Sequence, residues 1–199
     1  MIELPELLLP DAAAWRAWLL EHHASSPGVR LVLHKKGGTV TALDYAGALD
    51  EALCFGWIDG VIGKRDAGSY LTRFTPRTRT SKWSKNNVEN VQRLTSAGVM
   101  EPSGQAAIDA AKADGRWEAA YVNQADAQLP PDLAAAIAAN PRAQAMFEVL
   151  TAVNRYALIY RTTTVKTPAA RAAKIARFVE MLAAGETPHP QKRKAPPVG

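Results

Sequence analysis

The stretch that decides the fold of this chain is Cys54–Lys85, which reads CFGWIDGVIGKRDAGSYLTRFTPRTRTSKWSK. Within it, residues 57–62 and 70–74 alternate in the way that paired β-strands do. The glycine-bounded segment 63–68 between them has the length of a hairpin loop. We therefore expect an antiparallel hairpin over residues 57–75.

The residues that precede the hairpin alternate between helix and strand signals. Asp11 can cap a first helix, and residues 29–34 form a short apolar strand. Thr41 can cap a second helix, with Asp44 placed to reach back to its amide. Together with the hairpin, these elements predict an α+β region over residues 1–100, in which helices flank a small antiparallel sheet.

From residue 101 onward the chain is predicted to be helical. Asn140, Thr151 and Thr167 are placed to cap helices, and two of them precede a proline at the first helical position. No linker rich in glycine and serine separates the two halves, so we expect the helical region 101–186 to pack on the same core as the sheet. The tail 187–199 is rich in proline and lysine and is predicted to be disordered.

The composition is that of a globular protein with a substantial core, since 47% of its 199 residues are hydrophobic. No apolar run reaches the roughly 20 residues of a membrane-spanning helix, so we expect no membrane insertion. The first residues are acidic, whereas a secretory signal begins with basic residues. A single cysteine, Cys54, suits a reducing compartment. These features predict a cytoplasmic protein.

The net charge of +5 is unevenly distributed along the chain. Residues 1–60 carry an excess of four acidic groups, and residues 61–100 carry an excess of six basic groups. Residues 101–186 are balanced, and the tail adds three basic groups. A concentrated basic block indicates an anionic partner, although a solvated basic face with no partner is the alternative.

The two strands of the hairpin carry the first candidate site. Trp57 and Asp59 lie on one face of the first strand, and Arg73 lies on the second strand. Asp59 and Arg73 are expected either to form an ion pair that sets the strand register or to surround a ligand pocket with Trp57 and Arg77. In such a pocket, the indole would stack on the ligand and the guanidinium groups would bind an anion. A small-molecule enzyme that uses Asp59 is a further alternative.

The basic segment that follows the hairpin carries the second candidate site. Ser84 begins a helix whose free amides favour an anion, and Lys82 and Lys85 flank it. The segment therefore predicts binding of a small anionic or phosphate-bearing ligand. Nucleic acid is the larger alternative, bound by the basic and aromatic residues 73–85 with Trp83 stacked on a base. Otherwise Trp83 anchors the loop to the core.

Catalytic signatures are missing from the sequence. The run Gly60–Arg65 resembles a phosphate-binding loop, but the pattern would need glycine at position 58 and serine or threonine at position 65. No nucleophile elbow, paired-histidine zinc helix or dinucleotide-binding glycine run is present. We therefore expect a protein that is not an enzyme and has no metal site or cofactor, with Cys54 as a small core residue.

Several segments of the chain resemble the YdeI/OmpD-associated, or bacteriocin-protection, proteins. The segments that carry this resemblance are Leu31–Lys36, Ala52–Gly60, Arg73–Arg77, Ser81–Lys85, Asn140–Phe147, Arg155–Tyr156 and Arg171–Leu182. They extend over roughly residues 3–186. The resemblance implies a bacterial or archaeal protein with a role in tolerance of cationic antimicrobial peptides or bacteriocins. It implies no catalytic residue.

Overall fold

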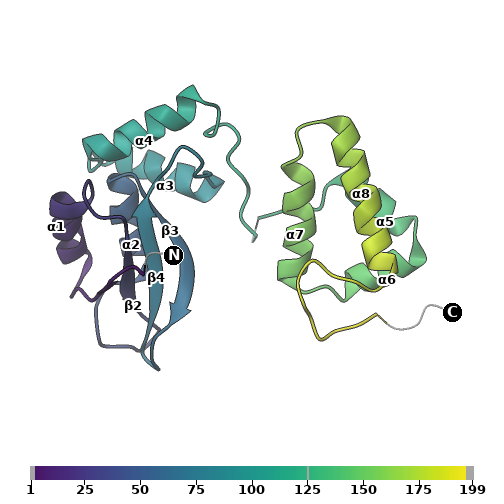
Figure 1. Cartoon of the computed structure of the whole chain (residues 1–199), viewed down its shortest axis with the longest axis horizontal. Helices are drawn as coiled ribbons and strands as arrows, with labels where there is room; N and C mark the ends of the chain where they lie inside the picture. The colour runs from purple at the N-terminus through teal and green to yellow at the C-terminus, as the bar shows by residue number, and fades with distance from the viewer. Residues whose placement is uncertain (1–2, 125, 196–199) are drawn as a thin grey trace. The chain divides into compact units, whose positions relative to one another are not determined.

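The computed structural model describes residues 3–124 and 126–195, and within them the predicted α+β class is confirmed. Eight helices and a four-stranded sheet are present, with all strands in the N-terminal half (Figure 1). The chain divides into two compact units, residues 1–120 and residues 121–199, called here the first and second units. No described helix combines the length and the apolar character needed to cross a membrane.

The first unit contains the sheet and four helices. Its elements are β1 (Glu6–Leu7), α1 (Ala12–His22), β2 (Val29–His34), α2 (Tyr45–Cys54), β3 (Trp57–Lys64), β4 (Ser69–Pro76), α3 (Lys85–Ser96) and α4 (Pro102–Ala113). The strand order is β1-β2-β4-β3, and β3 and β4 form an antiparallel hairpin. The sheet is mixed rather than purely antiparallel, because the two-residue strand β1 pairs in parallel with β2.

Side chains cap the first turns of α1, α2 and α3, whereas α4 has no side-chain cap. The Asp11 carboxylate accepts a hydrogen bond from the Ala14 amide at 2.9 Å, as its position predicts. At α2 the cap is Asp44, which accepts from the Gly47 amide at 2.8 Å, and not Thr41. The Thr41 hydroxyl instead donates to the Leu9 carbonyl at 2.6 Å, which ties the turn before α2 to the N-terminal segment.

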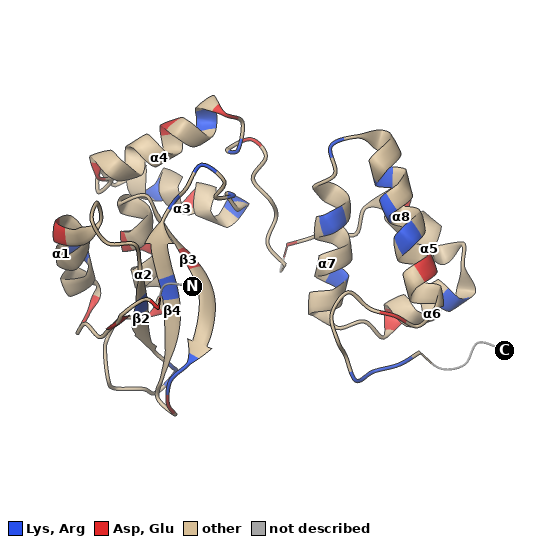
Figure 2. Cartoon of the chain, viewed as in Figure 1, with Lys and Arg blue, Asp and Glu red and all other residues tan. Residues whose placement is uncertain are grey.

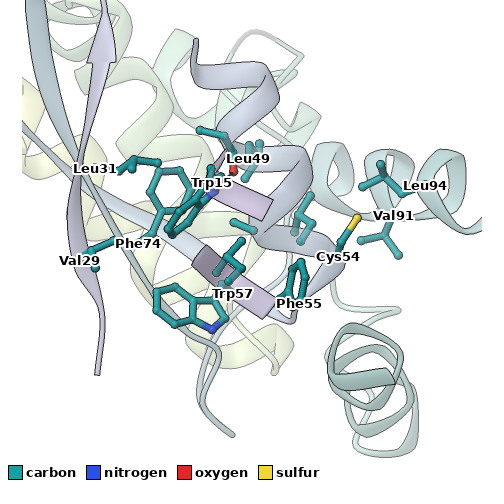
Figure 3. Close-up of a cluster of buried hydrophobic side chains, with 14 of the residues drawn as sticks. Trp15, Val29, Leu31, Leu49, Cys54, Phe55, Trp57, Phe74, Val91 and Leu94 are labelled. Carbon is teal, nitrogen blue, oxygen red and sulfur yellow. Dashed lines mark hydrogen bonds between the residues drawn. The ribbon is translucent and has the colours of Figure 1, made fainter. Parts of the chain in front are cut away.

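The helices of the first unit cover one face of its sheet. Alternate residues of β2, such as Leu31, join Phe74 of β4 and Trp15 of α1 in a buried aromatic and aliphatic cluster (Figure 3). Side chains of a strand alternate between its two faces, so Arg30 and Arg73 lie on the opposite, outer face. The packing thus separates an apolar inner face from an outer face that carries charge.

Helix α4 belongs to the first unit, although the predicted boundary between the α+β region and the helical region lies before it, at residue 100. Its Ile108 and Ala111 are members of the buried cluster of the sheet. Gly104 allows a close approach to the end of α2, because a Cβ at this position would lie 2.1 Å from the Cys54 carbonyl oxygen. The Glu101 amide donates to the same carbonyl at 3.1 Å.

The second unit is formed by four helices with a core of their own. These are α5 (Pro131–Ala138), α6 (Pro141–Glu148), α7 (Ala152–Thr163) and α8 (Pro168–Ala183). Side chains of Asn140, Thr151 and Thr167 cap α6, α7 and α8, as predicted. The described buried residues form two hydrophobic clusters, so the expectation of one shared core is corrected. The physical reason is that the apolar stripes of these four helices bury one another.

Part of the tail that was predicted to be disordered is bound to the second unit. Asn154 is buried, and its amide nitrogen donates to the His189 carbonyl at 3.0 Å while its oxygen accepts from the His189 amide at 2.8 Å. The Gln191 side chain donates to the Val149 carbonyl at 3.3 Å. These amide side chains bind the proline-rich segment to α7 and to the end of α6. Residues 196–199 of the predicted tail lie outside the described residues.

Candidate functional site

Trp57 lies in the core and not in a ligand pocket. Its side chain is only 1% exposed, and its indole nitrogen donates to the His23 carbonyl at 3.2 Å. The ring packs edge-on against Trp15, with centroids 6.1 Å apart (Figure 3). A ring enclosed in this way has no face left for a ligand, so the structure does not bring Trp57 to a binding surface.

Asp59 and Arg73 face opposite sides of the sheet and do not form the predicted ion pair. Asp59 is paired with Phe74, whereas Arg73 is paired with Arg30 of β2. The cause is a β-bulge between Asp59 and Ile62. In a regular hairpin without the extra residue, Asp59 would lie on the same face of the sheet as Arg73. The extra residue of the bulge moves the Asp59 side chain to the other face.

On its own face, Asp59 contacts the beginning of α2. Its carboxylate accepts a hydrogen bond from the Tyr45 hydroxyl at 2.8 Å. This bond gives Asp59 a structural role at the junction of β3 and α2. The use of Asp59 by an enzyme stays a prediction.

Arg77 and Trp83 hold the loop between β4 and α3. The Arg77 guanidinium lies over the Trp83 ring at 3.6 Å from its centroid, and it donates to the Lys82 carbonyl at 3.1 Å. Trp83 is 2% exposed and packs against Trp117. Trp83 therefore anchors the loop, and this buried ring is not available to stack on a base.

The remaining residues of the basic segment lie at the start of α3. Lys82 and Lys85 are exposed. Ser84 caps the helix, and its hydroxyl oxygen accepts from the Asn87 amide at 3.1 Å. This cap satisfies one of the amides that was expected to hold an anion. Binding of nucleic acid by residues 73–85 stays a prediction.

The outer face of the sheet contains a groove of about 630 Å³ in which Arg73 is the only residue that the sequence had singled out. We call it the sheet groove. It is lined by Glu3, Leu4, Pro27, Arg30, Val61, Gly63, Lys64, Leu71 and Arg73. Three of these side chains are cationic and one is acidic, and Leu4 and Leu71 are largely buried beneath them.

The cations of the sheet groove are poorly neutralised by the protein. The Arg30 guanidinium donates to the Leu4 carbonyl at 3.0 Å, and its distance to the Glu3 carboxylate is 3.7 Å. Arg73 and Lys64 make no hydrogen bond or ion pair with any residue that the structure describes. Since Arg30 and Arg73 are direct cross-strand partners, their like charges destabilise the pairing of β2 with β4.

Two members of the sheet groove, Arg30 and Lys64, were not among the predicted site residues. A signal for Arg30 was present, because it is the one arginine or lysine in the mostly apolar strand 29–34. Its position opposite Arg73 depends on the strand register, which residues 29–34 do not determine by themselves. Lys64 shows no such signal, since it ends a strand next to another basic residue, Arg65.

Cys54 is a core residue, as predicted. It is buried, and Figure 3 shows its sulfur directed toward Val91 and Leu94 of α3. Burial raises the pKa of the thiol, and this effect exceeds that of the hydrogen bond with Arg16, which lowers it. The thiol is therefore neutral and shielded.

Two family models match the chain, one after the other. The first, described as a domain of unknown function, DUF8412, matches residues 7–107, just over half of the chain. The chain belongs to the DUF8412 family. A second model, described as bacteriocin-protection, YdeI or OmpD-associated, matches residues 126–185. The resemblance to YdeI/OmpD-associated proteins is thereby confirmed for this part of the chain.

The match to the bacteriocin-protection model covers a shorter part of the chain than the resemblance, which extended over roughly residues 3–186. Its segments 140–147, 155–156 and 171–182 lie within the match, whereas the segments between 31 and 85 lie within the DUF8412 match. The sheet groove therefore belongs to the DUF8412 part of the chain. Searches of the curated proteins and of the solved structures gave no match for this DUF8412 protein.

Proposed function

We propose that this protein binds a small organic anion in the sheet groove and acts through that binding in tolerance of cationic antimicrobial peptides or bacteriocins. The observation that carries the binding proposal is the direct pairing of Arg30 with Arg73 on an open sheet face. Two like charges at paired positions weaken a sheet. A bound anion shared between them removes that repulsion.

The chemistry of the sheet groove indicates the class of ligand. Guanidinium groups bind carboxylates and phosphates through two parallel hydrogen bonds, and Lys64 adds a third positive charge. The underlying Leu4 and Leu71 suit an apolar body. A volume of about 630 Å³ lies within the range of small-molecule sites. The ligand we propose is therefore an organic phosphate or other small anion that has an apolar group.

Isothermal titration calorimetry with 1-naphthyl phosphate as the ligand tests the binding proposal. We expect Arg73→Gln to weaken binding by about tenfold or more, because charged hydrogen bonds are lost. Lys36→Gln removes an exposed cation of the same unit that does not line the groove, so it should bind like the wild type. Equal affinity for Arg73→Gln and wild type, or no binding at all, would contradict the proposal.

The physiological part of the proposal rests on the bacteriocin-protection match over residues 126–185. Deletion of the gene followed by challenge with several cationic peptides tests this part. We expect reduced survival, restored by the wild-type chain and not by Arg73→Gln. Survival that does not change for any of the peptides would contradict the physiological role and leave the binding proposal to its own test.

A further inference from the structure

The second unit has a groove of its own, of about 610 Å³, along α7. We call it the helical groove. The residues that matter for its chemistry are Leu129, Phe147, Ala152, Arg155, Tyr156 and Ile159. They come from the segment before α5, the end of α6 and the first turns of α7. All lie within the part of the chain that matches the bacteriocin-protection model, and none belongs to the sheet groove.

The floor of the helical groove is apolar and neutral. Leu129 and Phe147 are half-buried, so part of each side chain remains open to a ligand. Tyr156 uses its hydroxyl hydrogen to donate to the Val122 carbonyl at 3.0 Å. Burial raises the pKa of the Tyr156 hydroxyl, which keeps it uncharged. The charge in the helical groove therefore comes from Arg155.

Arg155 is held in place by neutral groups. One of its terminal nitrogens donates to the Glu148 carbonyl at 2.8 Å, and its guanidinium lies 5.1 Å from the centroid of the Phe147 ring. It forms no ion pair with a carboxylate in the described part of the chain. Arg171 of the same unit differs, since it binds both carboxylate oxygens of Asp132, at 2.6 and 2.9 Å. Arg155 thus presents a fixed and unneutralised hydrogen-bond donor beside an apolar floor.

The overall charge of the second unit also favours an anion. The unit has ten basic and five acidic side chains, whereas the first unit has fourteen of each. Figure 2 shows basic residues on α7 and α8 and on the segment that follows α8. A positive field of this kind raises the local concentration of anions.

We propose that the helical groove binds a terminal carboxylate attached to an apolar, aromatic-containing body. The carboxylate accepts hydrogen bonds from Arg155, and the body lies on Phe147, Leu129 and Ile159. Arg155 is the one cation among the described residues that line the groove, and a single cation suits one negative charge. This distinguishes the ligand from the phosphate of the sheet groove. The same chemistry occurs in a free arylalkyl acid and in the C-terminal residue of a peptide.

The test is a titration of the isotope-labelled full chain with three probes, in which changes of the backbone amide chemical shifts in NMR spectra report binding. The probes are 4-phenylbutanoate, a short peptide that ends in phenylalanine with a free carboxylate, and the same peptide with a C-terminal amide. We expect shifts in residues 147–159 for the first two probes and none for the amide. Shifts with 4-phenylbutanoate alone assign a free acid as the ligand, and shifts with the free peptide alone assign a peptide terminus.

Three variants make the assignment specific. Arg155→Gln should weaken binding by about tenfold or more. Ala152→Leu, at an exposed position that lines the groove, should block the body of the ligand without disturbing Arg155. Arg161→Gln changes a cation on the same helix that does not line the groove and should bind normally.

The outcome is independent of the sheet groove. Arg73→Gln should leave the shifts in residues 147–159 unchanged, so failure of either site is recognised separately. The helical-groove proposal is overturned if no carboxylate probe shifts these residues, or if Arg155→Gln and Ala152→Leu, folded by circular dichroism, bind as tightly as the wild type.

Discussion

At the scale of single residues, the sheet groove contains a like-charge pair that is expected to lower the stability of the free protein. Arg30 and Arg73 are paired across β2 and β4 without an acidic residue between them, and Glu3 reaches only Arg30. Four other arginines of the first unit form ion pairs at 2.8 Å or less with carboxylates, namely Arg16, Arg65, Arg93 and Arg116. The proposed binding of an anion in the sheet groove gives a reason for this uncompensated pair.

Replacing Arg73 by glutamine should therefore stabilise the free protein while it weakens binding of the anion. Removal of a like-charge pair is expected to raise the free energy of unfolding by about 0.2–1 kcal/mol at low salt. Urea denaturation followed by tryptophan fluorescence measures this change. The gain should shrink at high salt, because screening weakens the repulsion. A less stable Arg73→Gln protein at low salt would contradict this explanation.

The second prediction at this scale concerns Gly104. Its replacement by alanine should lower stability, whereas helix propensity alone would predict an increase. Alanine is favoured over glycine inside a helix by about 1 kcal/mol. In α4, however, the new Cβ would lie 2.1 Å from the backbone of Cys54. We expect Gly104→Ala to destabilise the first unit by about 1–3 kcal/mol, as overpacking does.

The adjacent residue provides the control for Gly104→Ala. The Ser103 hydroxyl is buried without a hydrogen-bond partner among the described residues, so Ser103→Ala should be neutral or slightly stabilising. Thermal unfolding of both variants measures the difference. If Gly104→Ala were as stable as Ser103→Ala, α4 would not approach α2 as closely as the structure indicates.

At the scale of elements, the hairpin β3–β4 decides which side chains reach the groove. The bulge between Asp59 and Ile62 turns Asp59 toward α2 and leaves Arg73 on the outer face. The loop of the hairpin is held by Asp66, whose carboxylate accepts hydrogen bonds from the Ser69 hydroxyl and amide, both at 2.7 Å. The geometry of the sheet groove thus depends on a turn that one carboxylate organises.

The stability of this hairpin should depend on pH. The hydrogen bond from the Ser69 side chain, followed by those from the Ser69 and Gly68 amides, lowers the pKa of Asp66. A lowered pKa in the folded state means that the stabilisation is complete above the unfolded value of about 3.9 and is lost as the pH falls through the folded value.

We therefore expect the free energy of unfolding of the wild type to fall more steeply than that of Asp66→Asn between about pH 5 and about pH 2. Tryptophan fluorescence reports on this unit, because all five tryptophans lie within residues 1–120. Glu89→Gln, which removes an exposed acid on α3, should keep the pH dependence of the wild type. Parallel curves for wild type and Asp66→Asn would contradict the role of Asp66.

At the scale of the whole molecule, the chain consists of two units that bury separate cores. Helix α4 packs with the sheet, so the division lies near residue 120 and not near residue 100. The two family models follow the same division, since one ends at residue 107 and the other begins at residue 126. Each unit also contains its own groove.

We predict that fragments 1–120 and 121–199 each fold on their own. Limited proteolysis of the full chain should cut first within residues 121–130, where the described residues between the two cores form no helix. Each separately expressed fragment should show a cooperative thermal transition. A stable fragment cut near residue 100, or an unfolded fragment 1–120, would contradict the division.

The sequence by itself determined the features that depend on neighbours along the chain. The hairpin follows from the alternation in residues 57–62 and 70–74, and caps such as Asp11 and Asn140 follow from the preference of short polar side chains for helix starts. The YdeI/OmpD-associated resemblance was likewise readable for residues 126–185. These signals are local, so they need no knowledge of packing.

Only the tertiary structure decided which side chains meet. One bulge residue reversed the side of the sheet on which Asp59 lies. The strand register placed Arg30 opposite Arg73, although the two residues are 43 positions apart in the sequence. Trp57 and Trp83 are buried in the core, because burying a large aromatic surface is more favourable than exposing it to water. A binding surface is made of residues that are distant in the chain. Strand register and packing determine which way their side chains point, and local periodicity does not encode either of them.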